Sequence, residues 1–159
     1  MRSKQSLGFT LIELLVSLAI LSVLGLMTVP VVEVMAQRTK EQDLRRALRD
    51  IRDAIDAYKR ATEDGSVEWR TGTSGYPPSL DILVSGAPSR ADPKGRKVYF
   101  LRRLPPDPLG DKRDLEASAT WGKRSFDSEA TAPREGDDVY DVYSLSDKTG
   151  LNGVPYRLW

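Results

Sequence analysis

The chain of 159 residues contains neither cysteine nor histidine. The lack of cysteine excludes disulfide bonds, thiolate nucleophiles and cysteine-based metal sites. The lack of histidine removes the commonest general base and metal ligand, so most hydrolase triads and transition-metal sites are also excluded. Positive and negative charges are balanced, with 24 Lys and Arg residues against 23 Asp and Glu residues. This balance argues against a strongly basic nucleic-acid-binding protein, and no nucleic-acid partner is predicted.

A long apolar run near the start of the chain contrasts with this charged composition. Leu14 to Val32 contains 19 residues without a charge, and extension back to Phe9 gives 24 residues. As a helix this segment is about 36 Å long, which exceeds the roughly 30 Å hydrocarbon core of a bilayer. Because no comparable apolar segment exists elsewhere to pack against it, the run predicts a membrane helix rather than a buried core helix.

Two features distinguish this run from an ordinary secretory signal peptide. A small residue, Gly8, lies before the apolar segment, whereas a signal peptidase site follows it. A carboxylate, Glu13, lies inside the segment. An acidic group near the bilayer costs several kcal/mol unless it is paired or lies at the interface, so Glu13 requires an explanation.

Residues 8–16, with the sequence GFTLIELLV, resemble the prepilin signature of type IV pilins and type II secretion pseudopilins. The resemblance implies that a membrane-embedded prepilin peptidase cleaves between Gly8 and Phe9 and methylates the new amine of Phe9. It also implies that Glu13 acts in assembly, where its carboxylate can pair with the Phe9 amine of its own chain or of a neighbouring subunit. The alternative is an interfacial glutamate that favours the positive end of the helix dipole.

Gly25 and Pro30 are predicted helix-breaking positions within the apolar helix. Proline removes a backbone hydrogen bond and commonly kinks a helix, although both residues are tolerated in membrane helices. The resemblance implies that this region partly unwinds in a filament. Partial unwinding and simple tolerance of these residues in a membrane helix stand as equal alternatives.

The helix is predicted to continue past the membrane as an amphipathic segment. An apolar stripe repeats at steps of three and four residues, formed by Leu44, Leu48, Ile51, Ile55 and Tyr58. The opposite face is charged, with Glu41 and Arg45 in a favourable i,i+4 order. An arginine cluster, Arg45, Arg46, Arg49 and Arg52, is interleaved with aspartates and therefore predicts a solvated or subunit-facing ion-pair face rather than a phosphate site. One helix of 54 residues, from Phe9 to Thr62, is expected.

Residues 65–159 are rich in proline, glycine and aromatic residues, which is typical of a small head with many loops and short strands. A short helix capped at its start is predicted over 79–84, a loop over 86–96, and a strand or extended segment over 98–101. Strands are predicted over 121–126 and 139–145, and an edge segment over 154–159. The expected fold is α+β, with the long helix packed on a small antiparallel sheet.

The head resembles the general secretion pathway protein G type, the major pseudopilin. The resemblance rests on Tyr76-Pro77, on the segment LPPDPLG at 104–110, and on YDVYS at 140–144. That subgroup often holds calcium in the loop after the last of these segments. Here the loop keeps one carboxylate, Asp147, and places Lys148 beside it. A plain hairpin is therefore favoured over metal binding, with Ser144 and Asp147 as candidate calcium ligands.

The predicted organisation has four parts: a prepilin leader peptide at 1–8, a hydrophobic transmembrane and assembly helix at 9–32, an amphipathic continuation at 33–64, and a periplasmic head at 65–159. The predicted function is a structural subunit of a type II secretion pseudopilus in the bacterial inner membrane, with a cytoplasmic N-terminus and a periplasmic head. The expected partners are copies of the same chain, minor pseudopilins, prepilin peptidase and the inner-membrane assembly platform.

Two alternative functions compete with this one. The chain could be a minor pseudopilin, or a type IV pilin for adhesion, motility or DNA uptake, although the lack of cysteine favours a pseudopilin. An anchored enzyme would have to work with carboxylates alone, such as Asp137, Asp138 and Asp141. These residues are better interpreted as a solvated loop and the start of a strand, and no enzyme activity is predicted.

Overall fold

The protein is described by a computed structural model that covers residues 8–68, 72–90, 95–110 and 115–159. Within the first helix, the side chains of residues 26–31 lie outside the description. The chain divides into two compact units, one ending at Arg38 and the other formed by Thr39–Trp159. The second unit is called the head below. The predicted division into leader, membrane helix and amphipathic continuation concerns processing and membrane insertion, and it stays a prediction.

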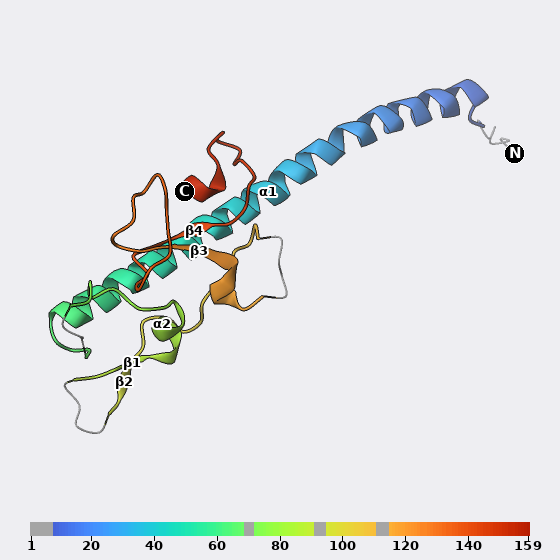
Figure 1. Ribbon diagram of the computed structural model, residues 1–159. Coiled ribbons are helices and arrows are strands. Elements are labelled where there is room, and N and C mark those ends of the chain that lie inside the picture. The colour runs from blue at the N-terminus through green and yellow to red at the C-terminus, as the bar shows by residue number, and fades with distance from the viewer. Residues whose placement is uncertain (1–7, 69–71, 91–94, 111–114) are drawn as a thin grey trace, which may run out of the picture. The chain divides into compact units, whose positions relative to one another are not determined.

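Helix α1 spans Leu11–Glu63 and contains 53 residues (Figure 1). The long helix predicted from the sequence is thus confirmed to within two residues at its start and one at its end. It ends where Gly65 adopts a φ of 78°, a conformation that glycine tolerates. The helix continues past Gly25 and Pro30, and the side chain of Pro30 lies outside the described residues. A break at these positions within a filament stays a prediction.

The core of the head is built on the predicted apolar stripe of α1. Leu44, Ile51 and Ile55 are completely buried, and Leu48 and Tyr58 are nearly so. The stripe belongs to one buried cluster with side chains from the rest of the head, among them Leu83, Trp121 and Val142. Apolar residues on one side of a helix gain stability only when a partner surface covers them. The segments that follow α1 supply that cover.

Two antiparallel pairs of short strands follow α1. Strand β1 (Ala87–Pro88) pairs with β2 (Lys97–Val98), and β3 (Trp121–Arg124) pairs with β4 (Asp141–Ser144). Strands β3 and β4 run beside the part of α1 that belongs to the head (Figure 1). The α+β class is confirmed, and the described residues form two small sheets where one was expected. The strands predicted over 121–126 and 139–145 are confirmed at shorter length.

The other short elements of the head are three helices of three to five residues. Helix α2 (Asp81–Ser85) confirms the short helix predicted after Pro77-Pro78, but its first turn has no side-chain cap. The 3₁₀ helix η1 (Ala117–Thr120) comes directly before β3. A second 3₁₀ helix, η2, spans Tyr156–Leu158. For α2, the predicted side-chain cap was therefore wrong, whereas the predicted helix is confirmed.

Two further predictions were wrong in part. Residues 86–96 were expected to form a loop, but Ala87–Pro88 pairs with β2 as an edge strand, where the missing N–H of proline does no harm. Residues 154–159 are predicted as an edge segment, but within them only Pro155 takes part in an isolated bridge, with Thr149, and Tyr156–Leu158 forms η2. The 3₁₀ turn buries the Tyr156 ring to 1% exposure, and an extended edge would point alternate side chains away from the core.

Candidate processing and assembly site

The Gly8–Phe9 junction lies just before α1 in exposed, non-helical chain. Gly8, Phe9 and Thr10 are all exposed and non-helical, and the Phe9 side chain is 77% exposed. A peptidase requires an accessible peptide bond that is not locked in a helical hydrogen-bond network. The junction in this structure meets that requirement.

Thr10 caps the start of α1. The backbone N–H of Glu13 donates to Thr10 Oγ1 at 3.3 Å, and that of Leu14 donates to the Thr10 carbonyl at 3.2 Å. Threonine followed three residues later by glutamate is a capping-box pattern, so the sequence contained this signal although Thr10 was not predicted as a cap. The Glu13 carboxylate thus lies in the first turn, where the helix dipole favours a negative charge.

The part of α1 that follows Glu13 keeps its large apolar side chains exposed. Leu14, Leu18 and Leu21 are 58–66% exposed, and Val23 and Leu24 are more than half exposed. The two serine hydroxyls in this stretch are satisfied within the helix, because Ser17 and Ser22 each donate to the carbonyl four residues earlier at 2.7 Å. Among the described residues, no helix is both long enough and apolar enough to span a membrane.

The predicted arginine cluster on α1 separates into different roles within the head. Arg46 lies 3.7 Å from Asp43 in an exposed ion pair, and Arg45 lies over the Trp159 ring at 4.3 Å. Arg49 is exposed. The cluster therefore does not form one phosphate-binding surface.

Arg52 connects α1 to β4 and to residue 159. Its Nε donates to Asp141 Oδ1 at 2.8 Å, and its Nη2 donates to the carbonyls of Val142 and Trp159 at 3.1 and 2.8 Å. Arg124 of β3 shares the same carboxylate, because its Nη2 lies 3.3 Å from Asp141 Oδ2. Asp141, one of the candidate catalytic carboxylates, is thus held by two guanidinium groups and joins three segments of the head.

The candidate calcium ligands do not come together. Asp147 is exposed, whereas Ser144 is completely buried and donates its hydroxyl to Asp107 Oδ2 at 2.6 Å. The other Asp107 oxygen accepts the backbone N–H of Leu109 at 2.8 Å, within the LPPDPLG turn. Ser144 and Asp107 therefore stabilise the attachment of this turn to β4.

A buried carboxylate, Glu41, was not predicted as a functional or structural site. Its side chain on α1 is 4% exposed, and its Oε1 accepts the Leu151 backbone N–H at 2.8 Å and the Tyr156 hydroxyl at 2.9 Å. The sequence placed Glu41 on the charged face with Arg45. The structure instead places the Arg45 guanidinium over Trp159 and buries Glu41 beneath the C-terminal segment.

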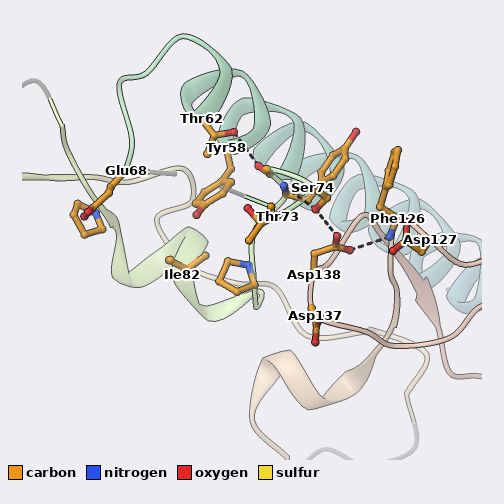
Figure 2. Close-up of a pocket in the computed structure, with 15 residues that line it drawn as sticks. Tyr58, Thr62, Glu68, Thr73, Ser74, Ile82, Phe126, Asp127, Asp137 and Asp138 are labelled. Carbon is orange, nitrogen blue, oxygen red and sulfur yellow. Dashed lines mark hydrogen bonds between the residues drawn. The ribbon is translucent and has the colours of Figure 1, made fainter. Parts of the chain in front are cut away.

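A hollow of about 860 Å³ in the head contains the remaining candidate carboxylates (Figure 2). Asp138 accepts hydrogen bonds from the Ser74 hydroxyl and from the Phe126 N–H, the latter at 2.8 Å, whereas Asp137 is exposed. Burial, and secondarily the charge of Tyr140 and of nearby carboxylates, raises the pKa of the lining residue Tyr76. The Asp138 carboxylate is used to hold the surrounding loops together.

Comparison with known proteins places these observations in context. The family model described as the prokaryotic N-terminal methylation motif matches residues 3–29. Over 154 residues the chain is 31% identical to the type II secretion system core protein G of Klebsiella pneumoniae, an alignment that covers 93% of this chain and 86% of the relative. No solved structure gives a significant match to this chain.

Proteins of the same name from two further organisms are also similar. The Pseudomonas aeruginosa protein is 29% identical over 140 residues, which cover 86% of this chain and 91% of that protein. The Aeromonas hydrophila protein is 29% identical over 130 residues, which cover 77% of this chain and 81% of that protein. The similarity thus extends through the head and is not limited to the N-terminal motif.

Proposed function

This chain belongs to the family of the type II secretion system core protein G, the major pseudopilin, and on that premise we propose that it is a structural subunit that polymerises into a periplasmic pseudopilus. Its role would be mechanical rather than catalytic. The observation that carries the proposal is the exposed Gly8–Phe9 junction, followed by Glu13 in the first turn of α1, which Thr10 caps.

The proposed maturation is cleavage between Gly8 and Phe9 by a prepilin peptidase, followed by N-methylation of Phe9. Cleavage removes the leader 1–8 and creates a positive amine directly before the first turn of α1. The Glu13 carboxylate can then pair with this amine or with that of a neighbouring subunit. In a low-dielectric bundle such a pair is much stronger than in water, and an unpaired carboxylate there is strongly penalised.

The proposed location is the bacterial inner membrane, with the N-terminus in the cytoplasm and the head in the periplasm. The uncharged run from Leu14 to Val32 and the exposed apolar side chains of its described part support insertion into lipid before assembly. The proposed partners are further copies of this chain, minor pseudopilins, the prepilin peptidase and the inner-membrane assembly platform. Gly25 and Pro30 would be the positions where α1 adapts in the filament.

The first experiment tests processing. The chain is co-expressed with a prepilin peptidase, and the mass of its N-terminal peptide is measured. We expect a mature chain that begins with N-methylated Phe9 and is 151 residues long after loss of the leader 1–8. A chain that keeps residues 1–8 intact in the presence of active peptidase would contradict the proposal.

The second experiment tests the role of Glu13. We expect Glu13→Ala to be cleaved normally and to lose most filaments in electron microscopy, because the new amine lacks its partner. Glu33→Ala is the matched control, since Glu33 is an exposed glutamate on the same helix and should assemble like the wild type. Normal filaments from Glu13→Ala would refute the intersubunit role. A deletion-and-secretion assay separates a pseudopilin from a pilus subunit.

A further inference from the structure

The C-terminal loop of the head, defined here as residues 144–156, is attached to α1 through the Glu41 carboxylate. One oxygen of this carboxylate accepts the Leu151 N–H from the middle of the loop and the Tyr156 hydroxyl from its end. Both Glu41 and Tyr156 are at least 94% buried. A buried carboxylate is unstable unless hydrogen-bond donors replace its lost water, so these contacts are required by the burial.

The C-terminal loop is also closed by its own backbone. The Gly150 N–H donates to the Val154 carbonyl at 2.9 Å, and the Tyr156 N–H donates to the Lys148 carbonyl at 3.1 Å. Glycine fits at position 150, since a Cβ there would lie 2.5 Å from Cζ2 of Trp159. The loop is therefore a compact turn packed under an aromatic ring, and it is anchored to α1 at Leu151 and Tyr156.

This loop is the segment in which the resemblance implied calcium, and its residues do not fit that ion. Calcium takes six to eight oxygen ligands, commonly from several carboxylates. Among the described residues, no group of three or more acidic side chains is placed to hold a metal. Asp147 is exposed and followed by Lys148, and the buried Ser144 hydroxyl donates to Asp107. The two buried carboxylates that reach the loop, Asp107 and Glu41, both accept hydrogen bonds from it.

We propose that Glu41 is a built-in latch that takes the place of a cation in closing the C-terminal loop. A bound cation would gather carbonyl and carboxylate oxygens around a positive charge. Glu41 works with the opposite charge, because its carboxylate accepts hydrogen bonds from the Leu151 N–H and the Tyr156 hydroxyl of the same loop. The loop geometry is thereby set by the chain itself, and the head of this pseudopilin folds without calcium.

The proposal is tested on the full chain in detergent by hydrogen-exchange mass spectrometry and thermal unfolding. For the wild type we expect the same melting temperature, and the same exchange in peptides from 144–156, in excess calcium and in a chelator. A calcium-dependent rise in melting temperature, or faster exchange of this loop in the chelator, would overturn the proposal. Neither measurement involves polymerisation, so the result is independent of the proposed assembly function.

Variants of the latch give the second test. Glu41→Met removes the acceptor but keeps the side-chain length, and we expect exchange of the C-terminal loop to become about tenfold faster or more, without recovery on adding calcium. Glu33→Met, an exposed glutamate on the same helix, is the matched control and should behave like the wild type.

Tyr156→Phe is a milder variant that keeps the ring and removes one donor. It decides the question if Glu41→Met fails to fold, and we expect faster exchange confined to the C-terminal loop. Exchange at the wild-type rate in Tyr156→Phe and Glu41→Met, or recovery of either variant by calcium, would refute the latch.

Discussion

A substitution of Arg52 should lower the free energy of unfolding of the head. Its guanidinium makes three hydrogen bonds, to the Asp141 carboxylate and to the carbonyls of Val142 and Trp159. Arg52→Met would remove all three while keeping an unbranched apolar side chain in place of the apolar stem of arginine. The substitution therefore separates the contribution of the hydrogen bonds from that of side-chain packing.

The expected loss in the free energy of unfolding follows from the exposure of the Arg52 and Asp141 side chains. Hydrogen bonds to a charged group contribute roughly 1.5–3 kcal/mol each when buried. The side chains of Arg52 and Asp141 are 37% and 27% exposed, so solvent screening lowers the value to about 1 kcal/mol per bond. Arg124 still neutralises Asp141 after the substitution, which keeps the loss at about 2–3 kcal/mol. For a head of this size, that corresponds to a decrease in melting temperature of roughly 10 °C.

The assay is thermal unfolding of the full chain in detergent, followed by tryptophan fluorescence. Arg49→Met is the matched control because Arg49 lies three residues earlier on α1, is exposed, and forms no hydrogen bond or ion pair with any residue that the structure describes. It should cost less than about 0.5 kcal/mol. Arg52→Lys should fall between the two, since an ammonium group cannot reproduce the fork of donors. Equal melting temperatures for the Arg52→Met and Arg49→Met variants would refute the reasoning.

Two further predictions concern the core of the head. Gly122→Ala should cost roughly 1–3 kcal/mol in thermal unfolding, because the new Cβ would lie 2.3 Å from the Tyr143 ring across the β3–β4 pair, and adding Tyr143→Ala should relieve that clash. Burial raises the pKa of Tyr58, so its contribution to stability is fully present below the unfolded pKa of about 10 and is lost as the pH rises through the higher folded value. Denaturant unfolding across this alkaline range should therefore show a smaller pH-dependent loss for Tyr58→Phe than for the wild type, and an identical loss would contradict this assignment.

The sequence predicted the elements whose signals are local. The spacing of Leu44, Leu48 and Ile51 indicated one buried side of a helix, and all three are buried. The strands predicted over 121–126 and 139–145 contain β3 and β4, each within two residues of its ends. Patterns of this kind depend on contacts between neighbours in one element, so a single sequence contains them.

The long-range contacts that close the head could not be predicted from local sequence patterns. Glu41 sits four residues before Arg45, which is typical of a surface ion pair, yet its hydrogen-bond partners Leu151 and Tyr156 are more than 100 residues away in sequence. A favourable spacing on a helix does not reveal which segment covers it. Thr10 is a different kind of omission, because the pattern of threonine followed by glutamate was visible and predicts a cap.

The two parts of α1 differ in what surrounds their apolar side chains, and this difference supports the proposed role of one carboxylate in assembly. The apolar stripe of α1 from Leu44 to Tyr58 is buried by the head, whereas Leu14, Leu18 and their neighbours remain exposed. In the proposed assembly this exposed surface passes from lipid to other subunits. Lipid chains are about as apolar as leucine, so the transfer yields little hydrophobic free energy. The proposed polar pair between Glu13 and a Phe9 amine would then be the interaction that distinguishes a neighbouring subunit from lipid.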